Sequence, residues 1–150
     1  MKAVVQRVSG AKVLIDGKRF SEIGPGSLVL LGIEHADQYS DIQWLVDKIV
    51  KMRIFPDDLK PINASLSQIG GDIMVVSQFT LHASTKKGNR PSFTYAAGPE
   101  QARKLYHDFL SYLRNSFDGN VVSGQFGKDM QLHLINDGPV TIIIDSKNRI

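Results

Sequence analysis

The chain has 150 residues, 42% hydrophobic and 22% charged, a composition that suits one folded domain and excludes a disordered chain. It has no cysteine, which excludes disulfides, thiolate metal sites and cysteine nucleophiles and favours a reducing, cytoplasmic location. The 18 Lys and Arg against 15 Asp and Glu give a net charge of +3, which suits a polyanionic partner. The longest clearly apolar run, residues 28–33, is too short to cross a bilayer, so we expect no membrane partner.

The N-terminal part of the chain has a β-rich pattern. Apolar and β-branched residues predict strands over residues 3–8, 12–15 and 27–33. The dipeptide Asp16-Gly17 is typical of a tight turn and marks a hairpin after the second of these strands. The chain is therefore expected to begin with paired strands.

A helix, a strand and a long loop are predicted next. Ser40 or Asp41 can cap a helix whose apolar positions recur with helical spacing: Ile42, Leu45, Val46, Ile49 and Val50. Residues 72–79 are apolar and β-branched, which indicates a buried central strand. Residues 82–99 are polar, so we interpret them as a long loop, and long loops in compact domains are often functional.

The C-terminal part is predicted to hold one helix and three strands. Pro99 suits the first position of a helix, and apolar residues follow at helical spacing: Leu105, Tyr106, Phe109, Leu110, Leu113 and Phe117. Strands are predicted over residues 120–126, 130–135 and 140–145. This order of elements favours a single α+β domain, residues 1–150, with helices packed on a largely antiparallel, barrel-like sheet.

The segment SQFTL, residues 77–81, joins the central strand to the polar loop and carries side chains that can do chemistry. In an extended strand Gln78, Thr80 and His82 would share one face and offer an amide, a hydroxyl and an imidazole. Such a face could hold a nucleophile and its base. Alternatively, Ser77 and Thr80 satisfy backbone groups at the strand end, and nothing evident orients His82 as a triad requires.

A second candidate element is NDGPVT, residues 136–141, which connects two predicted strands. A hairpin turn is its simplest interpretation. A glycine before a proline also permits close approach of a ligand and a cis peptide, so Gly138-Pro139 is a candidate binding element. Arg7, in the first strand, could bridge backbone carbonyl groups or lie on an exposed face of the strand.

Three cations of the polar loop, Lys86, Lys87 and Arg90, are candidates for contacts with phosphate groups, or they form a solvated charged segment. Together with a pI near 9.2 they make a nucleic acid a candidate partner. The four histidines are not spaced as metal ligands, so we expect no metal site.

SQFTL and NDGPVT together resemble the D-aminoacyl-tRNA deacylase family. The resemblance covers essentially the whole chain and includes four further segments: MKAVVQRV at 1–8, RIF at 53–55, TKKGNRPSF at 85–93 and FGKDMQ at 126–131. It implies a hydrolase that cleaves the ester between a D-amino acid and tRNA, or between glycine and the tRNA for alanine, and rejects L-aminoacyl-tRNA. It implies neither a cofactor nor a metal.

The same resemblance implies how the residues are used. Four residues line the catalytic pocket: Ser77, Gln78, Phe79 and Thr80. The family is a homodimer in which Gly138-Pro139, as a cis dipeptide, enters the active site of the other subunit and selects the chirality of the substrate. Arg7 holds this dipeptide in place. Aminoacyl-tRNA is the implied substrate.

Hydrolysis of an activated ester requires positioning, an oxyanion donor and water, and the backbone N–H of Phe79 is a candidate donor. Thr80 as a covalent nucleophile is the alternative, although no activating base is evident. Two other functions are considered. A small RNA-binding module without catalysis would suit the basic loop. A related deacylase for L-amino acids would need a modified proline turn, against which the intact motifs argue.

Overall fold

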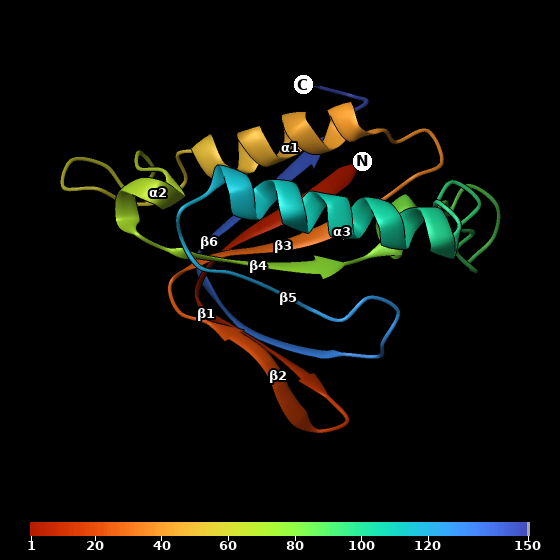
Figure 1. The fold of residues 1–150 in the computed structure, drawn as a ribbon, viewed down its shortest axis with the longest axis horizontal. Helices are drawn as coiled ribbons and strands as arrows, with labels where there is room; N and C mark the ends of the chain where they lie inside the picture. Colours follow the sequence, from red (N-terminus) through yellow and green to blue (C-terminus); the bar gives the residue numbers. More distant parts are fainter. Residues whose placement is uncertain (150) are drawn as a thin grey trace.

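Two long helices cover one face of a six-stranded sheet (Figure 1). The computed structural model describes residues 1–149. Its strands are β1 (Lys2–Ile15), β2 (Lys18–Ile23), β3 (Gly26–Gly32), β4 (Asp72–Ser77), β5 (Val121–Ser123) and β6 (Gln131–Asp145). Its helices are α1 (Tyr39–Lys51), α2 (Leu66–Ile69) and α3 (Pro99–Ser116), and η1 (Phe79–His82) is a 3-10 turn. α1 and α3 pack side by side.

β1 is the centre of the sheet, because it pairs with three other strands. One edge of β1 is antiparallel to β3 in its first half and to β2 in its second half, and the other edge is antiparallel to β6. β4 and β5 continue the sheet beyond β3 in parallel, and α1 and α2 lie in the long connection that a parallel pair requires. The predicted α+β fold, with helices on a largely antiparallel, barrel-like sheet, is confirmed.

The hydrophobic residues form two clusters. The larger cluster lies between the sheet and the helices, and it contains every apolar position predicted for the first helix together with Phe109 and Leu113 of α3. The smaller cluster lies on the opposite face of the sheet, since its β4 residues alternate with those of the larger cluster: Val8, Ala11, Val13, Ile23, Leu28, Met74 and Val76. Both helices predicted from apolar spacing are therefore confirmed, since the residues that define the spacing are buried.

The first β-structure differs in its boundaries from the prediction. Residues 3–8 and 12–15 belong to one continuous strand, β1. The predicted hairpin at Asp16-Gly17 is confirmed, and both residues have positive φ. Its second strand, β2, escaped prediction because four of its six residues are polar and its two apolar residues, Phe20 and Ile23, do not alternate as in a strand with one buried face.

Two local predictions are wrong. Gln38, and not Ser40 or Asp41, is the N-cap of α1, and Asp41 instead accepts a hydrogen bond from the Gln38 N–H (2.8 Å). Residues 136–141 do not form a hairpin, because β1 is long enough to pair with both halves of β6 as a single strand. Residues 137–140 bulge out of β6 where Gln6 pairs with Thr141 and Val8 with Asn136.

Candidate active site

The SQFTL segment lies where β4 ends and the chain turns. β4 stops at Ser77, two residues before the predicted end, and η1 follows. The Gln78 N–H donates to Leu31 O of β3 (2.7 Å), and the Leu81 N–H donates to Gln78 O (3.2 Å). The first bond holds the turn against the end of β3, and the second closes the turn itself.

η1 brings two of the predicted site residues into contact. Nε2 of Gln78 donates to Oγ1 of Thr80 (2.5 Å), and Phe79 between them is 55% exposed. His82 is 3% exposed, and its Nδ1 lies 3.9 Å from Oε2 of Glu34. The predicted common face of Gln78, Thr80 and His82 is therefore wrong, because a 3-10 turn does not alternate its side chains between two faces as a strand does.

Arg7 lies buried beneath the bulge of β6. Its Nε donates to Asp137 O (3.0 Å), and its Nη1 donates to Ile54 O (2.7 Å) and Pro61 O (3.1 Å). The carboxylate of Asp137 adds an ion pair, with Oδ2 at 3.5 Å from Nε. Of the two interpretations of Arg7, the one that bridges backbone carbonyls is correct.

Gly138 and Pro139 are exposed in the middle of this bulge. The peptide bond between them is cis, and Gly138 has a φ of 121°, a conformation that favours glycine. A Cβ at Gly138 would lie 2.8 Å from Nη2 of Arg7. The guanidinium therefore packs directly against the dipeptide.

The two elements of the candidate site lie far apart within one chain. Ser77 is level with Leu31 of β3 and, through it, with Ala3 of β1, whereas the bulge of β6 is level with Arg7. The offset from Ala3 to Arg7 corresponds to about 13 Å along the strands, and the spacings from β4 to β6 add about 14 Å across them. One chain alone does not bring the SQFTL segment and the bulge together.

The three predicted phosphate ligands, Lys86, Lys87 and Arg90, are exposed in the loop between η1 and α3. Two reciprocal hydrogen bonds close this loop at its base, from Ser84 N–H to Ser92 O (2.7 Å) and from Ser92 N–H to Ser84 O (2.9 Å). The loop begins directly after η1.

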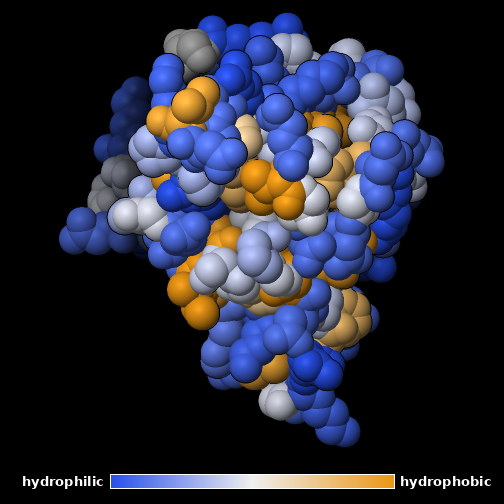
Figure 2. Space-filling view, turned by 90° about the vertical axis from the view of Figure 1, so that its left-hand side faces the viewer, coloured by the Kyte–Doolittle hydropathy of each residue, from blue (hydrophilic) through white to orange (hydrophobic). Residues whose placement is uncertain are grey.

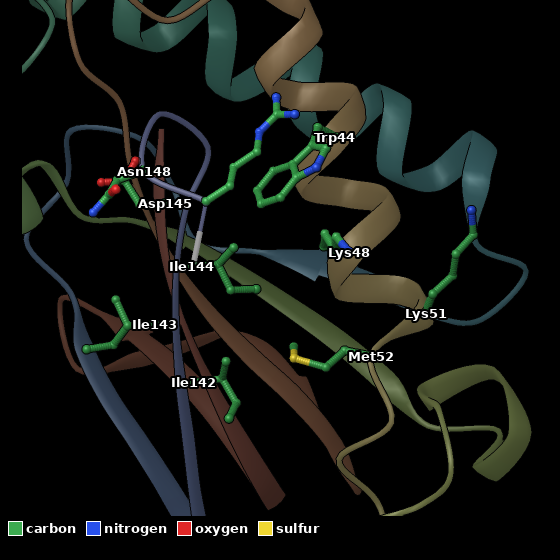
Figure 3. A pocket seen from close by; sticks show the side chains of 10 residues that line it. Trp44, Lys48, Lys51, Met52, Ile142, Ile143, Ile144, Asp145 and Asn148 are labelled. Atoms are coloured by element: carbon green, nitrogen blue, oxygen red, sulfur yellow. The ribbon is translucent and has the colours of Figure 1, made fainter.

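A surface groove of about 650 Å³ lies elsewhere. Side chains of Trp44 and Lys48 from α1 face Ile142 and Ile144 of β6 across it (Figure 3). None of the predicted site residues lines it. A polar cavity of about 440 Å³ lies beside η1, with His82 in its wall.

Within residues 1–149, His, Asp and Glu side chains form no group that could hold a metal ion. None of the helices in the same range is long and apolar enough to cross a membrane.

The comparison with known proteins decides the family. The sequence pattern of D-Tyr-tRNA(Tyr) deacylases matches residues 4–145. The D-aminoacyl-tRNA deacylases of Flavobacterium johnsoniae and Christiangramia forsetii are 53% and 55% identical to this chain over 149 residues, which is 99% of each chain. The chain belongs to the D-aminoacyl-tRNA deacylase family. As a D-aminoacyl-tRNA deacylase it is a hydrolase.

Solved structures support the same fold. The structure of a protein described as the c-Myc DNA Unwinding Element Binding Protein has a TM-score of 0.92 and 42% identity, and the match covers 97% of this chain and 98% of that one. A probable eukaryotic D-amino acid tRNA deacylase has a TM-score of 0.81 over 95% of this chain and 97% of its own. At 18% identity this second match shows that the deacylase fold is shared.

Two residues that support the SQFTL segment were not predicted for that role. Gly32 lies against η1, and a Cβ there would be 2.9 Å from Cβ of Leu81. A single glycine at the end of an apolar strand is a signal of such close packing. The hydroxyl of Tyr106 donates to Val75 O of β4 (2.9 Å), and burial raises the pKa of Tyr106 to about 12. Helical spacing predicts that Tyr106 is buried but does not predict its acceptor.

Proposed function

We propose that this chain hydrolyses the ester that joins a D-amino acid to the 3′-terminal adenosine of tRNA, in the cytoplasm and without a cofactor. We propose further that it releases glycine from the tRNA for alanine and spares L-aminoacyl-tRNA. Membership of the deacylase family over nearly the whole chain supports the substrate class. The observation that carries the proposal is the turn η1, which presents the Phe79 backbone and the Thr80 hydroxyl together at the end of β4.

The Phe79 N–H is proposed to stabilise the oxyanion. It is the first N–H of η1, so it has no acceptor within the turn. A backbone donor held by a rigid turn needs no reorganisation when negative charge develops on the carbonyl oxygen of the ester. Because an aminoacyl ester is already activated, such a donor and a positioned water suffice for hydrolysis.

Thr80 is proposed to position the substrate rather than to attack it. Its Oγ1 accepts the hydrogen bond from Gln78, so its own proton is free to be donated to the substrate. A threonine nucleophile needs a base that removes this proton. His82 does not fit that role, because its side chain is buried and the hydroxyl of Thr80 is bonded to Gln78 instead.

A second copy of the chain is proposed to complete the site. Within one chain the bulge of β6 is too far from η1 to meet a substrate held there, and it is exposed. Exposed apolar side chains lie close in sequence to the residues that hold the bulge. Leu59 and Ile62 are near Pro61, whose backbone oxygen accepts a hydrogen bond from Arg7, and Ile135 directly precedes Asn136. Apolar patches are visible on the face of the molecule that carries α2 (Figure 2). These features suit a subunit interface through which Gly138-Pro139 reaches the other active site.

Chiral selection is proposed to work by exclusion. The two enantiomers carry identical groups, so a wall on one side of the substrate Cα discriminates better than contacts with the side chain. Gly138 and Pro139, braced from behind by Arg7, form such a wall. Glycine has no side chain to exclude and is therefore accepted.

Lys86, Lys87 and Arg90 are proposed to contact phosphate groups of tRNA. All three are exposed, and the loop that carries them is closed at its base next to η1. Neutralising them should weaken tRNA binding and flatten its dependence on salt concentration, without any change in chiral selection.

Incubation of the purified protein with D-tyrosyl-, L-tyrosyl-, glycyl- and L-alanyl-tRNA tests the function. We expect loss of the D-tyrosyl and glycyl esters and survival of both L esters. Survival of glycyl-tRNA would contradict exclusion as the mechanism, because a pocket that rejects glycine selects for a D side chain. Binding of every tRNA with no loss of ester would favour the RNA-binding module instead.

A further inference from the structure

Three aromatic side chains are exposed beside the candidate active site. Phe79 of η1, Phe93 and Tyr95 are 55%, 37% and 63% exposed. The rings of Phe79 and Phe93 meet edge to face, with centroids 5.0 Å apart. Phe93 and Tyr95 belong to one turn, which the Ala96 N–H closes by donating to Phe93 O (3.0 Å). We call these three side chains the aromatic surface.

The aromatic surface is held in place by the fold. The Ala97 N–H donates to Ile33 O (2.9 Å), directly after β3, and Glu34 pairs with Ala96. A ring nitrogen of His35 lies 3.0 Å from the backbone oxygen of Thr94, which is the residue between Phe93 and Tyr95. Exposed aromatic rings on a fixed backbone lose little conformational entropy when a flat ligand stacks on them.

The charged side chains of the loop that carries Phe93 and Tyr95 are all positive, whereas Glu34 of a neighbouring segment shares the polar cavity with Tyr95. Between His82 and Pro99 the sequence contains Lys86, Lys87 and Arg90 and no acidic residue. The bonds between Ser84 and Ser92 place these cations in the same closed loop that ends at Phe93. Aromatic rings next to cations are the combination that binds single-stranded nucleic acids, since bases stack on the rings and phosphates pair with the cations.

Hydroxyl groups border the same surface. Tyr95 lines the polar cavity of about 440 Å³ together with Ser84 and Thr85. Hydroxyl groups can donate to and accept from the sugars and base edges of a single strand. The surface therefore offers stacking, charge and hydrogen bonding within one region next to η1.

We propose that Phe93 and Tyr95 extend the candidate active site outward and stack the unpaired nucleotides that precede the terminal adenosine of tRNA. This inference rests on the proposed function, because it assumes that the terminal ester lies at η1. A single strand that leads away from η1 crosses the aromatic surface and reaches the cations.

Two substrates of different length test this inference. Phe93→Leu and Tyr95→Leu keep apolar bulk but remove the ring, and Phe20→Leu is the matched control because Phe20 is 49% exposed on β2, away from the site. With D-tyrosyl-tRNA we expect each loop variant to raise KM by about tenfold. With 3′-O-(D-tyrosyl)adenosine, which lacks the preceding nucleotides, all variants should match the wild type. The increase in KM for D-tyrosyl-tRNA should not depend on salt concentration, because stacking releases few counterions.

Other outcomes overturn the inference. Equal losses on both substrates would assign the rings to the catalytic pocket, and unchanged KM for tRNA would remove them from the substrate path. If sedimentation shows that the wild type is a dimer and that either variant is a monomer, the rings belong to the subunit interface. If the wild type cleaves neither ester, the proposed function fails, but the aromatic surface is still tested. In that case its rings should strengthen binding of an acceptor-stem hairpin only when the hairpin carries its single-stranded 3′ end.

Discussion

A single buried arginine determines the shape of the bulge in β6. The guanidinium of Arg7 donates to backbone oxygens of Asp137, Ile54 and Pro61, which come from three separate segments. Lysine could not satisfy these acceptors, because its ammonium lacks the rigid fork of an arginine. The bulge is therefore held by side-chain bonds where its own strand pairing is interrupted.

Substitution of Gly138 by alanine tests this packing. A Cβ at Gly138 would lie 2.8 Å from Nη2 of Arg7, and the φ of 121° disfavours alanine in addition. We expect Gly138→Ala to lower the free energy of unfolding by about 1–3 kcal/mol and to abolish most deacylation. Urea unfolding and hydrolysis of D-tyrosyl-tRNA measure the two effects.

Gly70→Ala is the matched control for this variant. Gly70 also has a positive φ, of 61°, but nothing lies within 4 Å of a Cβ there. It should cost about 1 kcal/mol of stability and leave activity unchanged. Equal activity in the two variants would show that contact with Arg7 does not matter for the site.

The junction between β4 and η1 depends on support from two neighbouring elements. Tyr106 of α3 bonds the backbone of Val75, just before β4 ends. Gly32 at the end of β3 allows η1 to approach the sheet, since a Cβ there would be 3.1 Å from Gln78 O and 3.1 Å from Cδ2 of His82. The position of the Phe79 N–H therefore depends on how closely η1 packs on β3.

Gly32→Ala should displace η1 and so impair chemistry more than substrate binding. We expect a loss of about 1–3 kcal/mol in the free energy of unfolding, because the added methyl group overpacks the junction. In deacylation kinetics kcat should fall while KM for D-tyrosyl-tRNA stays close to the wild-type value. Gly10→Ala in β1 is the control, since the nearest atom to a Cβ there, Ile23 O, lies at 3.6 Å. A normal kcat in Gly32→Ala would disprove the dependence of the site on this packing.

The C-terminal segment is tied to the start of α1 by an ion pair. Nζ of Lys147 donates to Oδ2 of Asp41 (2.8 Å) and to Ala36 O (3.0 Å). Burial acts to raise the pKa of Asp41, but hydrogen bonds from Lys147 and from the Gln38 N–H outweigh it and hold this pKa below its ordinary value. The hydrogen bond to Asp41 raises the pKa of Lys147. This pair joins the C-terminal segment to the helical layer.

Lys147→Met should destabilise the protein in a pH-dependent way. At neutral pH we expect a loss of about 1 kcal/mol, which is modest because the lysine is partly exposed. Because the pKa of Asp41 is lower in the folded than in the unfolded protein, the pair stabilises the fold fully at pH values above the unfolded-state pKa. This stabilisation is lost as the pH falls through the folded-state pKa. The difference from the wild type should therefore shrink below about pH 4.

Urea unfolding between acid and neutral pH measures the effect of this variant. Lys51→Met, which breaks only the exposed pair with Asp47, should cost less than about 0.5 kcal/mol. A difference between Lys147→Met and the wild type that grows on acidification would contradict the role of Asp41.

The proposed assembly predicts complementation between subunits. Gln78→Ala and Gly138→Ala should each be inactive alone, because each removes one half of every site. If the halves come from different subunits, random exchange of the two variants restores about a quarter of the sites, since half of the dimers are mixed and each has one intact site. Absence of restored activity after exchange, which mass spectrometry of the mixed dimers can verify, would place both halves in one subunit.

Local features of the sequence were sufficient to predict much of the fold. Apolar spacing predicts α1 and α3, because residues that recur every three or four positions face the core wherever the helix lies. The Asp16-Gly17 turn and the buried strand before SQFTL are likewise properties of neighbouring residues. The two motifs of the family are contiguous segments, so the sequence also predicts the family and the residues proposed for its site.

The tertiary structure decides how these segments are joined. Whether residues 131–145 form a hairpin or one strand depends on their pairing with β1, whose residues lie more than a hundred positions away. The acceptors of Arg7 and the close approach of η1 to Gly32 also come from distant segments. The separation of η1 from the bulge of β6 follows from the register of three strand pairs. Strand register and side-chain contacts between distant segments depend on the packed core, and no local sequence pattern encodes them.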